Sequence, residues 1–126
     1  MVHNILLFFV DDLGYGDLGF TGNPSASTPN LDRLASAGKR LTNWYSGYPV
    51  CSASRTALLT GRQPPRVGMV GVINSLTAVG LPLSEITLAD ELRGAGYATL
   101  QVHVISNSGP WHHVSALSFA DLLLRS

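Results

Sequence analysis

Residues 51–62 read Cys-Ser-Ala-Ser-Arg-Thr-Ala-Leu-Leu-Thr-Gly-Arg and include the only cysteine of the 126-residue chain. A single cysteine cannot form a disulfide within the chain, so Cys51 serves either packing or chemistry. Residues 54–60 read as a helix, which places Cys51 near a helix N-terminus, where backbone N–H groups and the helix dipole favour an anion. Arg55 adds a fixed positive charge with a fork of donors that suits a tetrahedral oxyanion.

The alternative for Cys51 is a buried small apolar side chain, which is what most unpaired cysteines are. The N-terminal segment favours chemistry instead. Residues 5–10 read Ile-Leu-Leu-Phe-Phe-Val, and such a continuous apolar run is typical of a strand buried on both faces of a parallel sheet. This run ends abruptly in Asp-Asp-Leu-Gly-Tyr-Gly-Asp-Leu-Gly, residues 11–19.

Asp11 and Asp12 therefore stand at the C-terminal end of a predicted buried strand, where open α/β sheets bind their ligands. Two adjacent carboxylates repel one another and are costly to bury unless a cation compensates them. Their oxygen ligands indicate a hard divalent ion such as Ca²⁺ or Mg²⁺. The alternative is that both residues only begin a turn together with Gly14 and Gly16.

The run 51–62 resembles the signature of the sulfatase family, Cys-x-Pro/Ala-x-Arg followed by Thr-Gly-Arg, with Ala53 at the proline/alanine position. The resemblance, to the arylsulfatases in particular, extends from about Asn4 to Thr99 and includes residues 11–19, 28–35, 80–83, 87–89 and 96–99. It implies an α/β fold, as a fragment of an alkaline-phosphatase-like three-layer sheet with flanking helices. The alternation of strands and helices along the chain agrees with this class.

The resemblance also implies a sulfuric ester hydrolase that acts on a sulfate-ester substrate. Cys51 would be oxidised to formylglycine, whose hydrate is the nucleophile. Asp11 and Asp12 would bind one divalent cation, Ca²⁺, together with the group formed at Cys51. Arg55 would hold the nucleophilic side chain and neutralise the sulfate.

One stretch departs from the family pattern. Where the family has Gly-Lys-Trp-His-Leu-Gly, residues 100–108 read Leu-Gln-Val-His-Val-Ile-Ser-Asn-Ser, and Lys39 is the only lysine of the chain. Neither His103 nor the run Trp111-His112-His113 restores the motif. We therefore expect 1–99 to be the N-terminal part of a sulfatase catalytic domain and 100–126 to be a divergent C-terminal tail. We also expect the chain to be a truncated, inactive form, because the other metal ligands of the family come from a later region.

Two other functions compete with this one. The chain is a non-enzymatic truncated product that associates with full-length sulfatase, or it is a phosphatase or phosphonate hydrolase of the wider superfamily. Cys51 favours sulfate, because the phosphate enzymes of that group carry serine or threonine as nucleophile. Eight basic residues balance eight acidic ones, which argues against a nucleic-acid partner.

Targeting features are expected to be lacking. The first strand follows Met1-Val2-His3-Asn4 without a cationic leader, and the apolar run 5–10 is too short for a signal sequence or a membrane span. Relatives of this branch are lysosomal or secreted, whereas this chain, if made as written, is expected in the cytosol with Cys51 unmodified. A hydrophobic share of 45% and a mean hydropathy of +0.21 argue against disorder.

Local patterns predict the remaining elements. Thr28 as cap, Pro29 and Gly38 delimit a helix, with Leu31, Leu34 and Ala35 turned toward a core. Residues 41–45 are expected to form a short strand with Trp44 and Tyr45 buried. Beyond a loop at 62–80, we predict a helix that begins with a capping box at Thr87 and Asp90 and ends at 94–96. A strand at 97–105 and an amphipathic helix at 114–125 complete the prediction.

Overall fold

A computed structural model describes residues 3–73, 80–104 and 118–125. The chain divides into two compact units, one made of Met1–Asp11 with Ser46–Ser126 and the other of Asp12–Tyr45. None of the helices in the described residues combines the length and the apolar content needed to cross a membrane.

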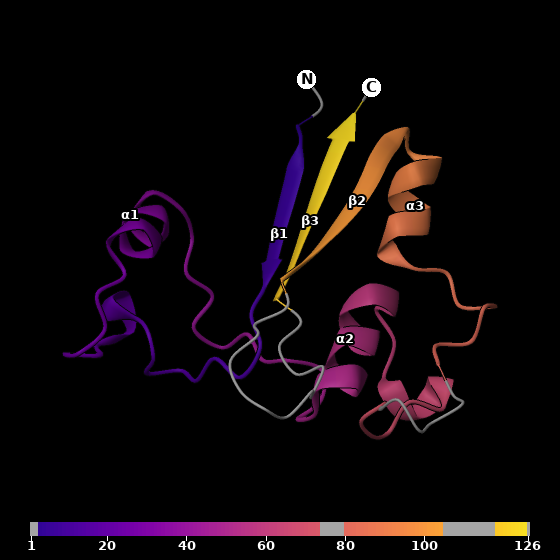
Figure 1. The fold of residues 1–126 in the computed structure, drawn as a ribbon, viewed down its shortest axis with the longest axis horizontal. Helices are drawn as coiled ribbons and strands as arrows, with labels where there is room; N and C mark the ends of the chain where they lie inside the picture. The colour runs from indigo at the N-terminus through magenta and orange to yellow at the C-terminus, as the bar shows by residue number, and fades with distance from the viewer. Residues whose placement is uncertain (1–2, 74–79, 105–117, 126) are drawn as a thin grey trace. The chain divides into compact units, whose positions relative to one another are not determined.

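The first unit contains a three-stranded sheet in the order β1-β3-β2 (Figure 1). Strand β1 spans Ile5–Phe9, β2 spans Tyr97–Val104 and β3 spans Ser118–Arg125. The middle strand β3 is antiparallel to both neighbours, with Phe9 opposite Phe119 on one side and Val104 opposite Ser118 on the other. Strands β1 and β2 therefore run in the same direction without touching, and the strand predicted at 97–105 is confirmed over Tyr97–Val104.

The setting predicted for β1 is wrong. The strand was expected to be buried on both faces of a parallel sheet, but it pairs with β3 in an antiparallel ladder. Leu6 and Phe8 are 51% and 64% exposed. The physical reason is that β3 is its main neighbour among the described elements, and α2 reaches it at Phe9, where Arg55 lies over the ring.

The amphipathic helix predicted at 114–125 is also wrong where the structure describes this segment. Residues Ser118–Arg125 form β3, and positions 114–117 lie outside the described residues. A central strand gains backbone hydrogen bonds along both of its edges, which outweighs a local helical spacing of leucines. The boundary between 1–99 and 100–126 falls inside β2, and this division of the chain stays a prediction.

The described part of the first unit also contains two helices and a 3₁₀ turn. Helix α2 spans Cys51–Thr60, α3 spans Leu88–Gly94, and the 3₁₀ turn η2 spans Pro64–Val67 within the predicted loop. Helix α3 packs against β2, and α2 contacts both α3 and η2. Among the residues whose burial the structure describes, the buried apolar ones lie on α2, on η2 and just after it: Ala53, Pro64, Val67 and Met69. Helices and strands thus both form, as expected for the α/β class, whereas a three-layer arrangement stays a prediction.

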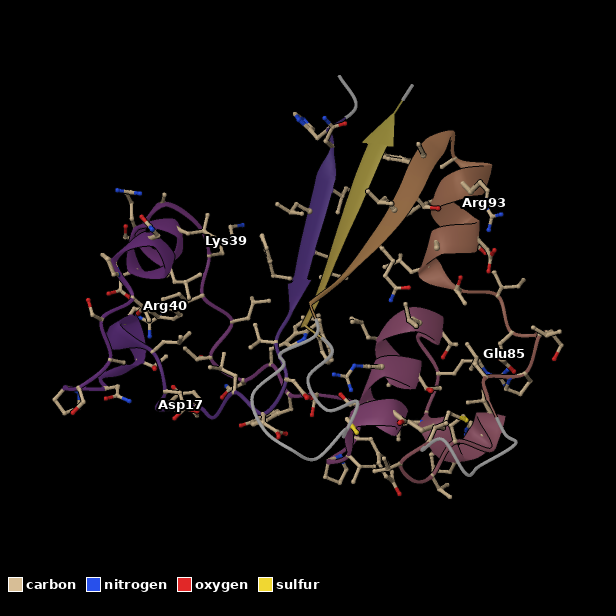
Figure 2. All side chains as sticks on the ribbon, in the orientation of Figure 1. Asp17, Lys39, Arg40, Glu85 and Arg93 are labelled. Atoms are coloured by element: carbon tan, nitrogen blue, oxygen red, sulfur yellow. The ribbon has the colours of Figure 1, made fainter. Side chains whose placement is uncertain are left out.

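The N-terminus of α3 carries the predicted capping box. The hydroxyl of Thr87 donates to Asp90 Oδ2 at 2.7 Å and accepts the backbone N–H of Asp90 at 3.3 Å. The Thr87 N–H also donates to the Asp90 carboxylate, at 3.0 Å. Arg93 pairs with Asp90 from one turn further on, on the side of α3 that faces away from the sheet (Figure 2). These contacts satisfy donors that a helix start otherwise leaves without partners.

Acid should weaken this cap. The side-chain and backbone hydrogen bonds from Thr87, helped by the charge of Arg93, lower the pKa of Asp90 below its ordinary 3.8. Because the folded carboxyl binds its proton less tightly than the unfolded one, its stabilisation is complete above 3.8 and is lost as pH falls through the lowered folded value. Asp90→Asn should therefore be slightly less stable than the wild-type chain at neutral pH, and this difference should shrink in acid. Urea unfolding of both proteins, from neutral pH down to below the lowered pKa of Asp90, measures this difference in the free energy of unfolding. A difference that does not vary with pH would contradict a capping role for the Asp90 carboxylate.

The second unit is held largely by a polar network. It contains the 3₁₀ turn η1 at Gly19–Thr21 and helix α1 at Pro29–Ala37, which confirms the helix predicted between Thr28 and Gly38. The Thr28 hydroxyl accepts the N–H of Gly19 at 2.9 Å and donates to Asp32 Oδ1 at 2.8 Å. Asp32 Oδ1 also accepts the N–H of Phe20 at 3.0 Å, so one carboxylate ties η1 to α1.

Apolar residues of the second unit contradict the prediction of a core. Leu31 and Leu34 are 47% and 65% exposed, and Trp44 and Tyr45 are each 78% exposed. Residues 41–45 form a turn rather than the expected strand. Below about 40 residues a chain cannot bury much apolar surface by itself. Apart from the polar network, the unit gains a cation–π contact in which Arg40, labelled in Figure 2, stacks on Phe20 at 5.0 Å.

Candidate functional site

Cys51 is the first residue of α2, so the predicted position of its sulfur near a helix N-terminus is confirmed. The helix begins three residues before the predicted start at residue 54 and is capped by Val50, whose carbonyl accepts the N–H of Ser54 at 2.8 Å. Cys51 is partly exposed, unlike the fully buried cysteine of the packing alternative. The first turn of α2 thus presents backbone N–H groups and a thiol at the same end of the helix.

Arg55 lies one turn further along α2 and is buried, with 7% of the residue exposed. Its Nη2 donates to Asp11 Oδ1 at 3.0 Å, and the side chains of the pair are only 9% and 17% exposed. The guanidinium carbon also lies 5.9 Å from the centre of the Phe9 ring. Phe9, at the end of β1, and Asp11, two residues further on, therefore hold Arg55 through an aromatic ring and a carboxylate.

The spacing along α2 relates this ion pair to the cysteine. Residues four apart on a helix lie on the same face, so Cys51 and Arg55 share one side of α2. The structure thus brings Asp11, two residues beyond the end of β1, to the helix that begins with Cys51. Asp12 is exposed, adopts a left-handed φ of 50° and is the first residue of the second unit. Asp12 is next to Asp11 along the chain, and no placement of it against α2 is described.

The two aspartates match a hard cation in the type of their donor atoms. Carboxylate oxygens are the ligands that Ca²⁺ and Mg²⁺ prefer. Across residues 3–73, 80–104 and 118–125, no three His, Cys, Asp or Glu side chains gather into a metal-binding group. Ca²⁺ takes about six to eight oxygens. Asp11 and Asp12 therefore fit part of a coordination shell and leave most of it to other ligands.

Comparison with known proteins decides the family. A sequence model described as Sulfatase matches residues 3–115. The chain belongs to the sulfatase family. It is 52% identical to arylsulfatase A of Bos taurus over 110 residues, which covers 86% of this chain and 20% of that protein. It is 51% identical to arylsulfatase A of Homo sapiens over 110 residues, with the same two shares covered. Steryl-sulfatase of Mus musculus is 49% identical over 115 residues, covering 86% of this chain and 18% of that protein.

The resemblance read from the motifs is therefore confirmed, and with it the relation to arylsulfatase A. The sulfatase chain spans about a fifth of the length of these curated relatives. Its family fits the alkaline-phosphatase-like superfamily, which was the fold class expected from the sequence.

Sequence reasoning missed several residues around the sulfatase signature. Phe9, beneath Arg55, was taken only as part of an apolar strand. Ser52, next to the cysteine, uses its hydroxyl oxygen to accept the N–H of Ile73 at 3.0 Å, which fixes the loop after η2 to the start of α2. Local sequence holds no signal for such contacts, because their partners lie far apart along the chain. His103 has no described side chain, and His112 and His113 lie outside the described residues.

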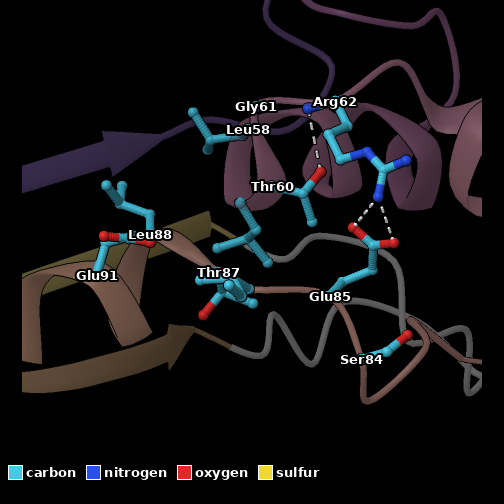
Figure 3. Close-up of a pocket in the computed structure, with 11 residues that line it drawn as sticks. Leu58, Thr60, Gly61, Arg62, Ser84, Glu85, Thr87, Leu88 and Glu91 are labelled. Atoms are coloured by element: carbon cyan, nitrogen blue, oxygen red, sulfur yellow. Dashed lines mark hydrogen bonds and ion pairs between the residues drawn. The ribbon is translucent and has the colours of Figure 1, made fainter. Parts of the chain in front are cut away.

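A hollow of the first unit lies at the other end of α2 (Figure 3). It has a volume of about 490 Å³ and is lined by residues 58–62, 84–88 and 91. At its rim, Arg62 Nη1 donates to both carboxylate oxygens of Glu85 at 2.7 and 2.8 Å. A neighbouring hollow of about 330 Å³ extends toward β2. Cys51, Asp11 and Arg55 line neither hollow, whereas the C-terminal part of the signature, residues 58–62, lines the first of them.

Proposed function

We propose that this chain carries the nucleophile-bearing part of a sulfatase active site, with Cys51 as the precursor of formylglycine. Family membership supports sulfuric ester hydrolysis as the reaction class. The observation that carries the proposal is the buried contact between Asp11 and Arg55, one helical turn from Cys51. That contact is made between a residue of the run 11–19 and a residue of the run 51–62, the two motifs on which the proposal depends.

In this proposal each residue has a distinct task. The N-terminus of α2 attracts the sulfate through its backbone N–H groups. Arg55, held by Asp11 and stacked against Phe9, keeps a fixed positive charge beside the nucleophile and needs little reorganisation when substrate binds. Asp11 and Asp12 contribute carboxylate oxygens to one divalent cation. When bound, a cation such as Ca²⁺ would offset negative charge on the sulfuryl oxygens.

The modification of Cys51 is an oxidation of its Cβ. The C–S bond and one C–H bond of Cβ are broken, a C=O bond forms, and the sulfur leaves as hydrogen sulfide. Cβ gives up two electrons in this step. Dioxygen, the oxidant that a modifying enzyme must use, takes these two electrons and two more from an external thiol reductant, which becomes a disulfide, and one water forms. The hydrated aldehyde then offers one hydroxyl for attack on sulfur and a second for release of sulfate, which is a form of covalent catalysis. A thiol lacks this second route. The use of Cys51 in place of serine or threonine favours sulfate over phosphate as the transferred group.

We further propose that residues 1–126 alone do not turn over sulfate esters. Residues 100–108 lack the lysine that the family motif supplies at this point. Asp11 and Asp12 would leave most of a Ca²⁺ shell to water, so affinity for the ion should be weak. Any activity would then require association with a longer sulfatase chain that contributes the other ligands.

The test compares the 126-residue chain made through a secretory pathway with the same chain made in the cytosol. Peptide mass spectrometry should find an aldehyde at residue 51 only in the secreted protein, and an unmodified thiol in the cytosolic one. Neither form should hydrolyse a chromogenic aryl sulfate, with or without Ca²⁺, above the rate of a Cys51→Ala variant. Ser52→Ala is the control for the mass measurement, because it changes the neighbouring residue and keeps Cys51.

The two parts of the proposal fail separately. A secreted chain whose Cys51 stays a thiol would overturn its assignment as the formylglycine precursor. Cation-dependent hydrolysis that disappears in Cys51→Ala would uphold that assignment and overturn the proposal of inactivity.

A further inference from the structure

The ion pair between Asp11 and Arg55 uses one oxygen of the carboxylate. Arg55 Nη2 donates to Asp11 Oδ1 at 3.0 Å, and among the described residues no hydrogen bond reaches Asp11 Oδ2. The pair between Arg62 and Glu85 differs, because Arg62 Nη1 donates to both carboxylate oxygens, at 2.7 and 2.8 Å. The Asp11 carboxylate therefore keeps one oxygen for a second positive group.

Both residues of this ion pair belong to the first unit, and the pair is largely shielded from water. The side chains of Arg55 and Asp11 are 9% and 17% exposed. Charges in such a place interact strongly, because little water screens them. Asp11 is also a carboxylate to which a divalent cation is assigned above. Two positive groups therefore depend on the same negative charge.

We propose that Arg55 and the divalent cation compete for the charge of Asp11, so that binding of the cation weakens the hold of Asp11 on Arg55. The inference rests on the cation role proposed for Asp11 and does not need the conversion of Cys51. One carboxylate cannot neutralise a guanidinium and a doubly charged ion together, and the two positive groups repel each other. The coupling is mutual: Arg55 must lower the affinity for the cation by the same factor by which the cation weakens the ion pair.

The competition would regulate the charge at the N-terminus of α2. In the structure Asp11 offsets the charge of Arg55, which lies one turn beyond Cys51 on the same face of the helix. A cation on Asp11 reduces this offset. The charge of Arg55 then acts on an anion at the helix start, which the backbone N–H groups also attract. A sulfate ester thus meets the full charge of Arg55 mainly after the cation has bound.

Two effects of Arg55 on cation affinity oppose each other. The guanidinium orders the Asp11 side chain in advance, which raises the affinity by up to about tenfold. It also places a positive charge beside the carboxylate that the cation must bind. For a doubly charged ion a few ångströms away in a partly buried place, this repulsion lowers the affinity by about a hundredfold or more. The repulsion is the larger effect, so removing Arg55 should strengthen cation binding.

The test measures Ca²⁺ affinity through its effect on the free energy of unfolding, because an ion that binds the folded chain raises this quantity. The full chain, cleared of metal with a chelator, is unfolded in urea across a CaCl₂ series at a constant ionic strength of about 0.1 M. Arg55→Met should need about tenfold less CaCl₂ than the wild-type chain for the same gain in stability. Arg62→Met is the matched control and should behave as wild type. It removes the same charge from the other end of the same signature, where Arg62 pairs with Glu85.

A second measurement uses the wild-type chain and does not depend on a variant being folded. Adding CaCl₂ should shift the NMR signal of the Nε–Hε group of Arg55, because its carboxylate partner takes up the ion. The corresponding signal of Arg62 should stay in place, since its partner Glu85 has no proposed role in cation binding. Asp11→Asn should abolish the shift at Arg55.

The outcomes separate this inference from the proposed function. Equal or weaker Ca²⁺ binding by Arg55→Met would overturn the competition and leave the cation role of Asp11 intact. An Arg55 signal that does not move while Ca²⁺ binds in an Asp11-dependent way would do the same. A similar gain in Arg62→Met would show a general effect of charge and overturn the competition as well. Absence of any Asp11-dependent Ca²⁺ binding would overturn both the competition and the cation role, whereas the assignment of Cys51 would stand.

Discussion

Replacing Asp11 by asparagine should lower the free energy of unfolding by about 3 kcal/mol, because it leaves the charge of Arg55 without its carboxylate in a buried place. The side chains of the two residues are 17% and 9% exposed, so water cannot take over the lost interaction easily. Removing one partner of such a pair costs more than the pair itself contributes to stability. Urea unfolding followed by circular dichroism, in a buffer with a chelator, measures the loss without a contribution from bound cations.

Asp12→Asn is the matched control for this prediction. It makes the same chemical change one residue later, at an exposed position whose left-handed φ of 50° asparagine tolerates. We expect it to change stability by less than about 0.5 kcal/mol. Similar losses in the two variants would contradict a special role for the contact between Asp11 and Arg55.

A double substitution tests whether the loss of stability in Asp11→Asn comes from removing one charge of the buried pair. Arg55→Met alone should also destabilise, because it leaves the Asp11 carboxylate without its buried partner. Combining Asp11→Asn with Arg55→Met removes both charges, so the double variant should be more stable than the sum of the single losses predicts. Additive losses would show that the two side chains act independently.

The candidate site was predictable as far as its two motifs were concerned. A strand followed by Asp11 and a helix N-terminus close to Cys51 could be read from local composition, and their meeting followed from the way α/β sheets collect functional groups at strand ends. The two motifs are joined by the hydrogen bond from Arg55 to Asp11, two residues that are 44 positions apart in the chain. No local pattern predicts such a partner, and the same holds for the Phe9 ring against its guanidinium.

The fold was predictable where short-range chemistry determines it. The capping box at Thr87 depends on neighbours within one helical turn, and both helices begin as predicted, although the Thr28 hydroxyl makes no capping hydrogen bond. The segment Ser118–Arg125 was mistaken for helix because its leucines recur at a helical spacing. Its two partner strands are distant in sequence, and pairing with both of them overrides that spacing. The prediction that Trp44 and Tyr45 are buried was wrong for a related reason, since no local pattern shows how much apolar surface a small unit can bury.

Gly47→Ala should destabilise the first unit by about 2 kcal/mol, because α2 leaves no room for a side chain at this position. A Cβ built on Gly47 would meet the Cβ of Ala57 far inside normal contact distance. Either the segment around Gly47 or helix α2 would have to move, and α2 is the helix that begins with Cys51 and carries Arg55. Urea unfolding should therefore show a lower free energy of unfolding for Gly47→Ala. The amide hydrogens of α2 should also exchange faster, by a factor that does not depend on the protein concentration.

Gly71→Ala is the control for this substitution, because an added Cβ there meets no atom within 4 Å. It should be neutral or slightly stabilising, since alanine restricts the unfolded chain more than glycine does. Ala57→Gly should lower the free energy of unfolding by about 1 kcal/mol, because glycine has a lower helix propensity than alanine. It also removes the methyl group with which the added Cβ of Gly47→Ala would overlap. The double variant should thus lose less stability than the two single losses combined. A double variant with strictly additive losses would mean that the backbone near residue 47 approaches α2 less closely than the structure has it.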